Sequence, residues 1–153
     1  VYMKNMLRNF NYIVYSEKSK EAIFFDPFDL DKTLAIASSL NLNPKYLVNT
    51  HHHHDHIKDN EKFLNLKQTQ LVTLKDDEIF KLSEGDYIKA MDTPGHVMDH
   101  QCFIVYSDNN PIGLIAGDAL FNAGVGNCKN GGDVKTHFQT IYHGIRNLSE
   151  FQR

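Results

Sequence analysis

The chain has 153 residues and a net charge of −3, which suits one domain with a real hydrophobic core and argues against a basic surface for nucleic acid. Its longest apolar run, around residues 22–25, is far shorter than the roughly 20 residues of a membrane span. Two cysteines do not make a disulfide framework, so we expect a reducing compartment, the cytosol or the mitochondrial matrix.

The first half of the chain is predicted to alternate short strands with helices. Leu30, Leu34 and Ala37 recur at helical spacing, and Asn43-Pro44 follows them as a stop signal. The elements expected here are strands over 13–15, 22–26 and 46–49, and helices over 30–40 and 57–64.

The second half is predicted to be richer in strands, which cover 71–72, 87–91, 101–107 and 112–116. Asp108-Asn109-Asn110-Pro111 is typical of a hairpin turn. A glycine-rich loop over 124–132 leads into a helix over 134–148, whose apolar stripe would be Val134, Phe138, Ile141, Ile145 and Leu148. Helices alternating with strands around a mixed sheet indicate an α/β fold.

The most informative stretch starts at Thr50 and reads His-x-His-x-Asp-His from His51 to His56. It follows a predicted strand, and residues two apart on an extended chain point the same way. We therefore expect His51 and His53 to converge on one metal ion, and Asp55 and His56, at the turn into a helix, to reach a second. A purification tag or a loose His-rich tract fits this position inside a fold poorly.

Two later segments supply the same types of ligand. His96 follows the turn Pro94-Gly95 at the end of one predicted strand, and Asp118 follows Gly117 at the end of another. Three apolar strands thus each end in a side chain that can bind a metal. This pattern is typical of a site that loops build at the edge of a sheet.

The remaining histidines make weaker candidates. His52 and His54 point away from the ligand face because side chains alternate along a strand. His137 and His143 belong to the last predicted helix. His143 lies opposite its apolar stripe, whereas His137 flanks the stripe and could tuck against the sheet; both are expected at the surface or its boundary. His100 either orients a metal ligand or is an ordinary polar loop residue, and the sequence leaves both interpretations open.

These motifs resemble the metallo-β-lactamase superfamily and, within it, the hydroxyacylglutathione hydrolases (glyoxalase II). The resemblance runs along nearly the whole chain. The segments that carry it are Asn11-Tyr12, Ala22 to Pro27, Thr50 to His56 with Asn60 after it, Thr93 to His96 with His100 and Cys102 after it, and Gly117 to Phe121.

The resemblance implies an αββα sandwich. Residues 1–153 would form a single metallo-β-lactamase-like domain, C-terminally truncated, in which the second half of the sandwich is incomplete. We expect a partner chain or a missing C-terminal segment to cover the sheet edge that this leaves open.

The resemblance also implies two zinc sites, although iron or manganese would suit the same ligands. His51, His53 and His96 would hold the first ion, Asp55 and His56 the second, and Asp118 would bridge the two. Asp55 and Asp118 are the expected catalytic residues. The family has a further histidine in the second site, which we do not find in this chain, so we expect that site to be incomplete.

The implied activity is hydrolysis of S-2-hydroxyacylglutathione, with S-lactoylglutathione giving glutathione and D-lactate. Two ions can activate water near neutral pH and polarise an acyl carbonyl, and a thiolate leaves without a strong general acid. Asn127 and Lys129 occupy the places that correspond to the glutathione contacts of the family, so we expect them to bind the substrate.

Two other functions stay open. A mono-iron persulfide dioxygenase of the same superfamily would bind one iron through His51, His53, His96 and Asp118 and would need no second site. A non-catalytic subunit would keep the fold as a scaffold in a larger assembly, although the intact ligands of the first site argue against it. Metal content and a thioester assay discriminate between these functions.

Overall fold

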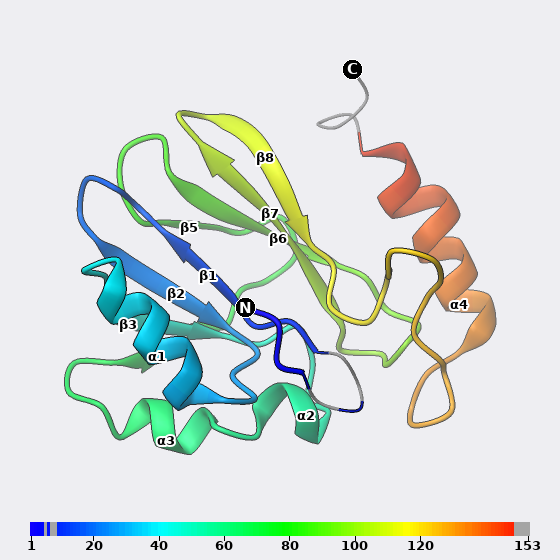
Figure 1. Ribbon diagram of the computed structural model, residues 1–153. Helices are drawn as coiled ribbons and strands as arrows, with labels where there is room; N and C mark the ends of the chain where they lie inside the picture. Colours follow the sequence, from blue (N-terminus) through cyan, green and yellow to red (C-terminus); the bar gives the residue numbers. More distant parts are fainter. Residues whose placement is uncertain (5, 7–8, 149–153) are drawn as a thin grey trace.

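The computed structural model describes residues 1–4, 6 and 9–148, and two four-stranded sheets form its centre (Figure 1). The strands of the first sheet, in spatial order, are β1 (Tyr12–Tyr15), β2 (Glu21–Phe25), β3 (Asn43–Val48) and β4 (Gln70–Leu71). β1 is antiparallel to β2, whereas β2, β3 and β4 are parallel. The loops after β2 and β3 therefore leave from the same edge of this sheet.

The second sheet is an antiparallel meander of β5 (Ile79–Lys81), β6 (Tyr87–Asp92), β7 (Gln101–Ser107) and β8 (Asn110–Ile115). The predicted turn between the last two strands is present. Ser107 pairs with Asn110, and the two residues between them, Asp108 and Asn109, have φ of 47° and 62°. Positive φ at both positions defines a type I′ turn, whose twist matches that of a hairpin.

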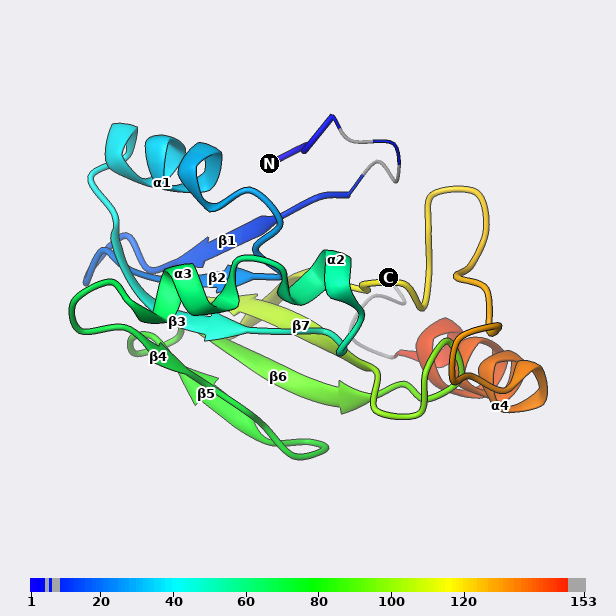
Figure 2. The same ribbon diagram turned by 90° about the horizontal axis from the view of Figure 1, so that it is seen from below.

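The helices are α1 (Leu30–Ser39), α2 (His54–Ile57), α3 (Asn60–Leu64) and α4 (Val134–Gln139). A π-helical turn over Thr140–Gly144 and a 3₁₀ turn over Ile145–Asn147 continue α4. Figure 2 shows α1 and α4 on opposite sides of the pair of sheets. Within the described residues, no helix combines the length and the apolar character needed to cross a membrane.

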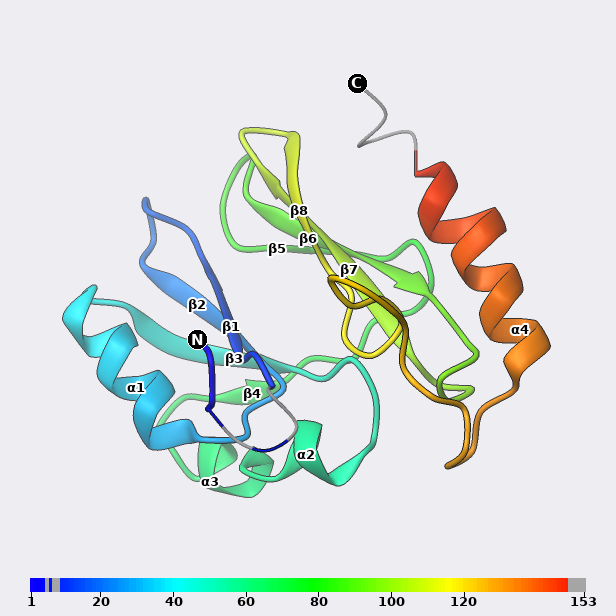
Figure 3. The same ribbon diagram turned by 45° about the vertical axis from the view of Figure 1, so that its right-hand side comes forward.

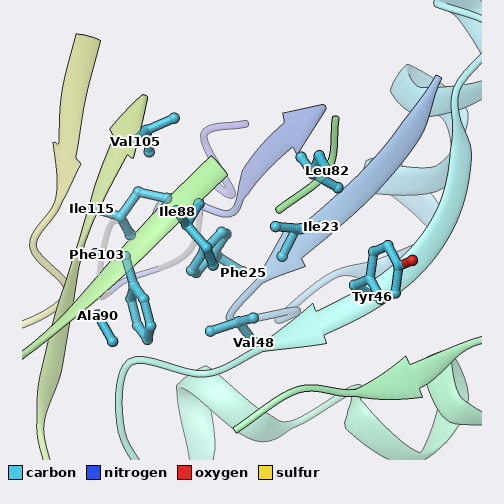
Figure 4. Packing of buried hydrophobic residues seen from close by; sticks show 10 residues of the cluster. All are labelled: Ile23, Phe25, Tyr46, Val48, Leu82, Ile88, Ala90, Phe103, Val105 and Ile115. Atoms are coloured by element: carbon cyan, nitrogen blue, oxygen red, sulfur yellow. The ribbon is translucent and has the colours of Figure 1, made fainter. Parts of the chain in front are cut away.

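The main core lies between the two sheets (Figure 4). Alternation along β2 directs Ile23 and Phe25 into this layer, where Phe25 meets Phe103 of β7 with 5.2 Å between ring centroids. The other buried members are Tyr46, Val48, Leu82, Ile88, Ala90, Val105 and Ile115. This packing fixes the relative position of the strand ends that carry the candidate ligands.

A second cluster packs α1 and α3 against the outer face of the first sheet. Alternate residues of β2, Ala22 and Phe24, contact Leu30 of α1 and Phe63 of α3 in this layer. A third cluster, of Cys102, Ala119 and Ile145, packs the segment after Gln139 against the second sheet. The layers are thus helix, sheet, sheet and helix, which confirms the predicted αββα architecture.

Several element boundaries differ from the sequence prediction. β5 was not predicted, because its three residues are too few to show a period. β3 starts at Asn43 rather than at Tyr46. The helix predicted over 57–64 is divided into α2 and α3, and Asp59 lies at the break between them. Its side chain accepts the backbone N–H of Leu30, the first residue of α1, at 2.8 Å.

The predicted stripe on the last helix is partly wrong. Val134 and Phe138 are 73% and 55% exposed, whereas His137, predicted at the surface or its boundary, is only 4% exposed. The face that meets the sheet begins at His137 and continues through Ile141 and Ile145. At the start of the helix the packed position is therefore His137 instead of its neighbour Phe138, and the side chains of Val134 and Phe138 face outward. His143 is exposed, as predicted.

Candidate metal centre

Loops from both sheets meet at one edge of the sandwich. The backbone N–H of Gln101 donates to the carbonyl of Thr50 at 2.8 Å, which joins the end of β3 to the start of β7. The N–H of Thr93 donates to the carbonyl of His100 at 2.8 Å, which closes the loop that carries His96. Figure 3 shows the loop after β8, in yellow and orange, running from the second sheet to α4.

Three histidines converge at this edge, as the motif predicted. Nδ1 of His53 lies 3.0 Å from Nε2 of His51 and 3.0 Å from Nε2 of His96. One nitrogen from each residue lies within 4.8 Å of the other two, so the three can hold a single ion. His51 and His96 are buried and His53 is half-buried.

In two of these histidines, His53 and His96, the ring nitrogen that points away from the other rings is held by a carbonyl oxygen. Nε2 of His53 donates to the carbonyl of Asn130 at 3.2 Å, and Nδ1 of His96 donates to the carbonyl of Asn127 at 2.6 Å. A carbonyl can only accept, so the proton sits on the outward nitrogen and the converging nitrogen keeps its lone pair. The ring pair is therefore set up as neutral metal ligands.

A second group shares His51 with the first and adds His56 and Asp118. Nδ1 of His56 donates to Oδ2 of Asp26 at 2.9 Å. Its buried Nε2 makes no hydrogen bond within the described part of the chain. It faces Oδ1 of Asp118 at 3.3 Å and Oδ2 of Asp55 at 3.4 Å.

The surroundings of His56 call for a positive charge at its Nε2. Burial alone would lower the pKa of His56, but the carboxylates of Asp118 and Asp26 raise it to about 10. A proton supplies that charge in the metal-free protein, and a metal cation bound between the imidazole and the carboxylates would supply it equally well. The buried, unpaired nitrogen and the donor set of imidazoles and carboxylates thus fit a divalent metal such as zinc.

Asp118 belongs to the second group and also reaches the first. Its Oδ1 faces His56, and its Oδ2 lies 3.4 Å from Nε2 of His96. Burial would raise the pKa of Asp118, but contact with His56 and the neighbouring rings of His96 and His100 lowers it, so the carboxyl is ionised. One carboxylate can therefore offer an oxygen to each group.

Asp55 faces the second group from its side, with Oδ2 lying 3.4 Å from Nε2 of His56. It does not belong to either converging group, and its Oδ2 accepts a hydrogen bond from Nδ2 of Asn9 at 2.9 Å. Asn9 lies before β1, 46 residues from Asp55 in the chain. Asn9 therefore helps to hold Asp55 beside the second group, a contact that the sequence did not reveal.

Asp26 and Thr50 are further site residues that sequence reasoning missed. Asp26 is buried at the end of β2 and accepts the N–H and the hydroxyl of Thr50, both at 2.8 Å, as well as His56. The hydroxyl of Thr50 in turn accepts from Nδ1 of His51 at 3.0 Å. The sequence did contain a sign of Asp26: the Asp26-Pro27 pair is part of a segment that carries the family resemblance, but the sequence analysis assigned it no function.

His100 is buried beneath the site, at 1% exposure. Its ring lies between Thr93 and the backbone of Asp118, with contacts of 2.7 Å and 3.1 Å. Burial, with the nearby ring of His96, lowers its pKa to about 3, so the ring is neutral. Of the two interpretations left open by the sequence, the contact with Asp118 favours the first.

The two predicted substrate residues, Asn127 and Lys129, are exposed on the loop after β8. The side chain of Asn127 accepts the N–H of Lys129 at 3.0 Å, and its carbonyl holds His96. Gly126 lets this loop approach closely, because a Cβ there would lie 2.2 Å from the carbonyl oxygen of Asp118. His52 pairs at the surface with Asp99 at 2.8 Å, away from the converging nitrogens.

Comparison with known proteins matches the fold and the motifs. A sequence profile of the metallo-beta-lactamase superfamily matches residues 12–95. The chain is 35% identical to the hydroxyacylglutathione hydrolase of Nitrosococcus oceani over 90% of this chain and 57% of that protein. It is 32% identical to the enzyme of the same name from Polaromonas sp. over 98% of this chain and 62% of that protein.

A solved structure, ETHE1 from Myxococcus xanthus, superposes with a TM-score of 0.79 at 20% identity over 90% of this chain and 65% of that one. At that identity the likeness shows the fold alone. The chain belongs to the metallo-β-lactamase superfamily. Within the superfamily it resembles the hydroxyacylglutathione hydrolases, as the motifs predicted, and it spans less than two thirds of the length of these two relatives.

Proposed function

We propose that the protein is a two-metal hydrolase of thioesters, with S-2-hydroxyacylglutathione, such as S-lactoylglutathione, as the substrate. The observation that carries the proposal is the pair of ligand groups that share His51, with Asp118 extending one oxygen towards each. The names of the relatives support the choice of substrate.

In this proposal His51, His53 and His96 hold the first ion, His56 and Asp55 hold the second, and Asp118 serves both. When bound, two zinc ions supply Lewis acidity and lower the pKa of water towards neutrality; iron or manganese would supply similar chemistry. The residues of the chain hold the ligand nitrogens in their unprotonated form, through the carbonyls of Asn127 and Asn130 and the hydroxyl of Thr50.

A thioester suits this set of residues better than an amide does. A thiolate leaves without a strong general acid. Each histidine of the centre has one ring nitrogen in a hydrogen bond to the protein and would offer the other nitrogen to an ion, so none is left to act as that acid. Asp55 and Asp118 are the carboxylates that would orient the attacking water and the ions. Asn127 and Lys129 are exposed on the loop after β8, where they would contact the thiol carrier. The reducing compartment expected from the sequence would supply glutathione.

The mono-iron dioxygenase and the non-catalytic subunit are the alternatives. The dioxygenase needs only one ion. It therefore gives no role to the position of the buried His56 Nε2, which faces the carboxylates of Asp55 and Asp118. The scaffold reading gives no reason for the fixed tautomers of His53 and His96. Both alternatives predict no thioester hydrolysis.

The test is hydrolysis of S-lactoylglutathione by untagged protein supplied with zinc, iron or manganese, followed as release of free thiol. We expect hydrolysis that Asp118→Asn lowers by at least about 100-fold, since the change removes a charge that serves both ions. Asp99→Asn, at the surface, is the control. Metal-loaded protein that cleaves no glutathione thioester, or equal rates in the Asp118 variant, would refute the proposal; iron-dependent oxygen consumption with a persulfide would favour the dioxygenase.

A further inference from the structure

His100 connects two of the loops that carry candidate ligands. It follows the loop of His96, and its ring lies under the turn that carries Asp118. Its two ring nitrogens are both used inside the protein: Nδ1 meets Oγ1 of Thr93 at 2.7 Å, and Nε2 meets the backbone N of Asp118 at 3.1 Å. His100 is therefore not free to bind an ion itself.

The partners of His100 fix which nitrogen carries the proton. A backbone N–H only donates, so Nε2 must accept from Asp118 with its lone pair. The proton of the neutral ring then lies on Nδ1 and is donated to the hydroxyl oxygen of Thr93. The hydroxyl proton of Thr93 has the carbonyl of His100 and the sulfur of Cys102 as acceptors, at 3.4 Å and 3.3 Å.

The turn before Asp118 is shaped to rest on this ring. Gly117 has a φ of +48°, and a Cβ at this position would lie 2.7 Å from Nε2 of His100 and 2.7 Å from Oγ1 of Thr50. The backbone can approach the ring only because Gly117 has no side chain. This contact holds the backbone of Asp118 in the position from which its carboxylate faces both His56 and His96.

We propose that His100 is a positioning residue, which fixes the backbone of Asp118 by accepting its amide hydrogen and thereby sets how tightly Asp118 binds metal. The inference depends on the proposed metal centre, but it assigns to His100 a role that none of the ligands performs. Outer partners of metal ligands commonly account for a 10–100-fold factor in metal affinity, roughly the size expected here.

A pair of amide substitutions separates the two hydrogen bonds of His100. In His100→Gln the longer side chain places an oxygen near the position of Nε2 and can still accept from Asp118. In His100→Asn the shorter side chain stays near Thr93 and cannot reach Asp118. We expect zinc affinity, measured by competition with a chromophoric chelator, to fall roughly 10–100-fold in His100→Asn and to stay close to that of the unsubstituted protein in His100→Gln. His143→Gln, on an exposed histidine, is the control.

The zinc-free stability of each variant, from thermal unfolding, separates positioning from a merely structural role. Equal losses of stability with unchanged zinc affinity in both variants would overturn the inference and leave the proposed function intact. Unsubstituted protein that binds no zinc would refute the proposed function and this inference with it.

Should His100→Asn fail to fold, the hydroxyl of Thr93 offers the same test. Thr93→Val removes the acceptor that keeps the proton on Nδ1, so we expect weaker zinc binding, and Thr93→Ser should restore it. Nitrogen NMR of the zinc-bound protein reads the tautomer directly. A protonated Nδ1 and an unprotonated Nε2 on His100 are expected, and the reverse tautomer would overturn the inference.

Discussion

At the scale of single residues, the carboxylate of Asp26 accepts three hydrogen bonds, two from Thr50 and one from His56. It thus orients His56 directly and His51 through Thr50. Asp26→Asn replaces one acceptor oxygen with an amide that can only donate, towards groups that are donors themselves. We expect zinc affinity to fall roughly 10–100-fold, by chelator competition, with Asp99→Asn as the surface control. Unchanged affinity in a folded Asp26→Asn variant would contradict this role.

The two cysteines differ in their expected reactivity. Cys102 is fully buried in β7, and burial raises the pKa of its thiol to about 12. Cys128 is partly exposed on the loop after β8, where burial, together with the carboxylate of Asp133, raises the pKa of its thiol. Because the thiolate is the reactive form, we expect iodoacetamide to label Cys128 first and Cys102 only on unfolding, as read by mass spectrometry. Equal labelling of both in the native protein would mean that the core opens readily.

Residue-level prediction succeeded where spacing alone decides geometry. The period of two along an extended chain placed His51 and His53 on one side, and the ends of predicted strands located His96 and Asp118. The roles of Asp26, Thr50 and Asn9 were not visible, because each depends on a contact between segments far apart in the sequence.

At the scale of elements, Asp86 ties the two sheets together at the end away from the metal centre. Oδ2 of Asp86 accepts from Ser16, after β1, and from Ser83, both at 2.7 Å, and Oδ1 accepts from Ser107 of β7 at 3.2 Å. These hydroxyls lower the pKa of Asp86 to about 2. A carboxyl with a depressed folded-state pKa stabilises the protein above its unfolded value, and that stability is lost as the pH falls.

We therefore expect the free energy of unfolding to decline between about pH 4 and about pH 2, and Asp86→Asn to remove part of that decline. Urea unfolding at a series of pH values measures it, with exposed Asp31→Asn as the matched control. An Asp86→Asn variant whose stability follows the same pH curve as the unsubstituted protein would exclude this carboxylate as the cause.

The last helical segment gives a further test, because its packed face differs from the predicted one. Ile145 is buried against Cys102 and Ala119, whereas Phe138 is 55% exposed. We expect Ile145→Ala to cost about 2–5 kcal/mol of unfolding free energy and Phe138→Ala about 0.5 kcal/mol or less. A larger loss of unfolding free energy for Phe138→Ala than for Ile145→Ala, in urea unfolding, would contradict this packing.

Element prediction was accurate where a continuous apolar run marks a buried strand, as in β2 and β7. It failed for β5, which is held by pairing with β6 rather than by its own pattern. It also failed at the start of α4, where a histidine faces the sheet and the neighbouring apolar side chain faces outward. In both places contacts with distant segments outweigh the local pattern.

At the scale of the whole molecule, the sandwich brings one edge of each sheet to a common site. The parallel strands β2 and β3 supply Asp26 and the histidine motif from one sheet, and the loops after β6 and β8 supply His96 and Asp118 from the other. The core between the sheets therefore determines the distance between the two halves of the ligand set. The layered architecture was predictable from the motifs through their resemblance to a known family, whereas the contacts that align the ligands required the structure.

A zinc titration of variants at two neighbouring histidines is the sharpest test of the metal centre. His53 lies among the converging nitrogens, whereas its neighbour His52 is paired with Asp99 at the surface. With affinity read by chelator competition and stoichiometry by elemental analysis, we expect at least one zinc per chain in the unsubstituted protein and in His52→Gln. We expect the loss of that tight site in His53→Gln. A folded protein that binds no zinc, or that binds it equally well without His53, would contradict the proposed metal centre.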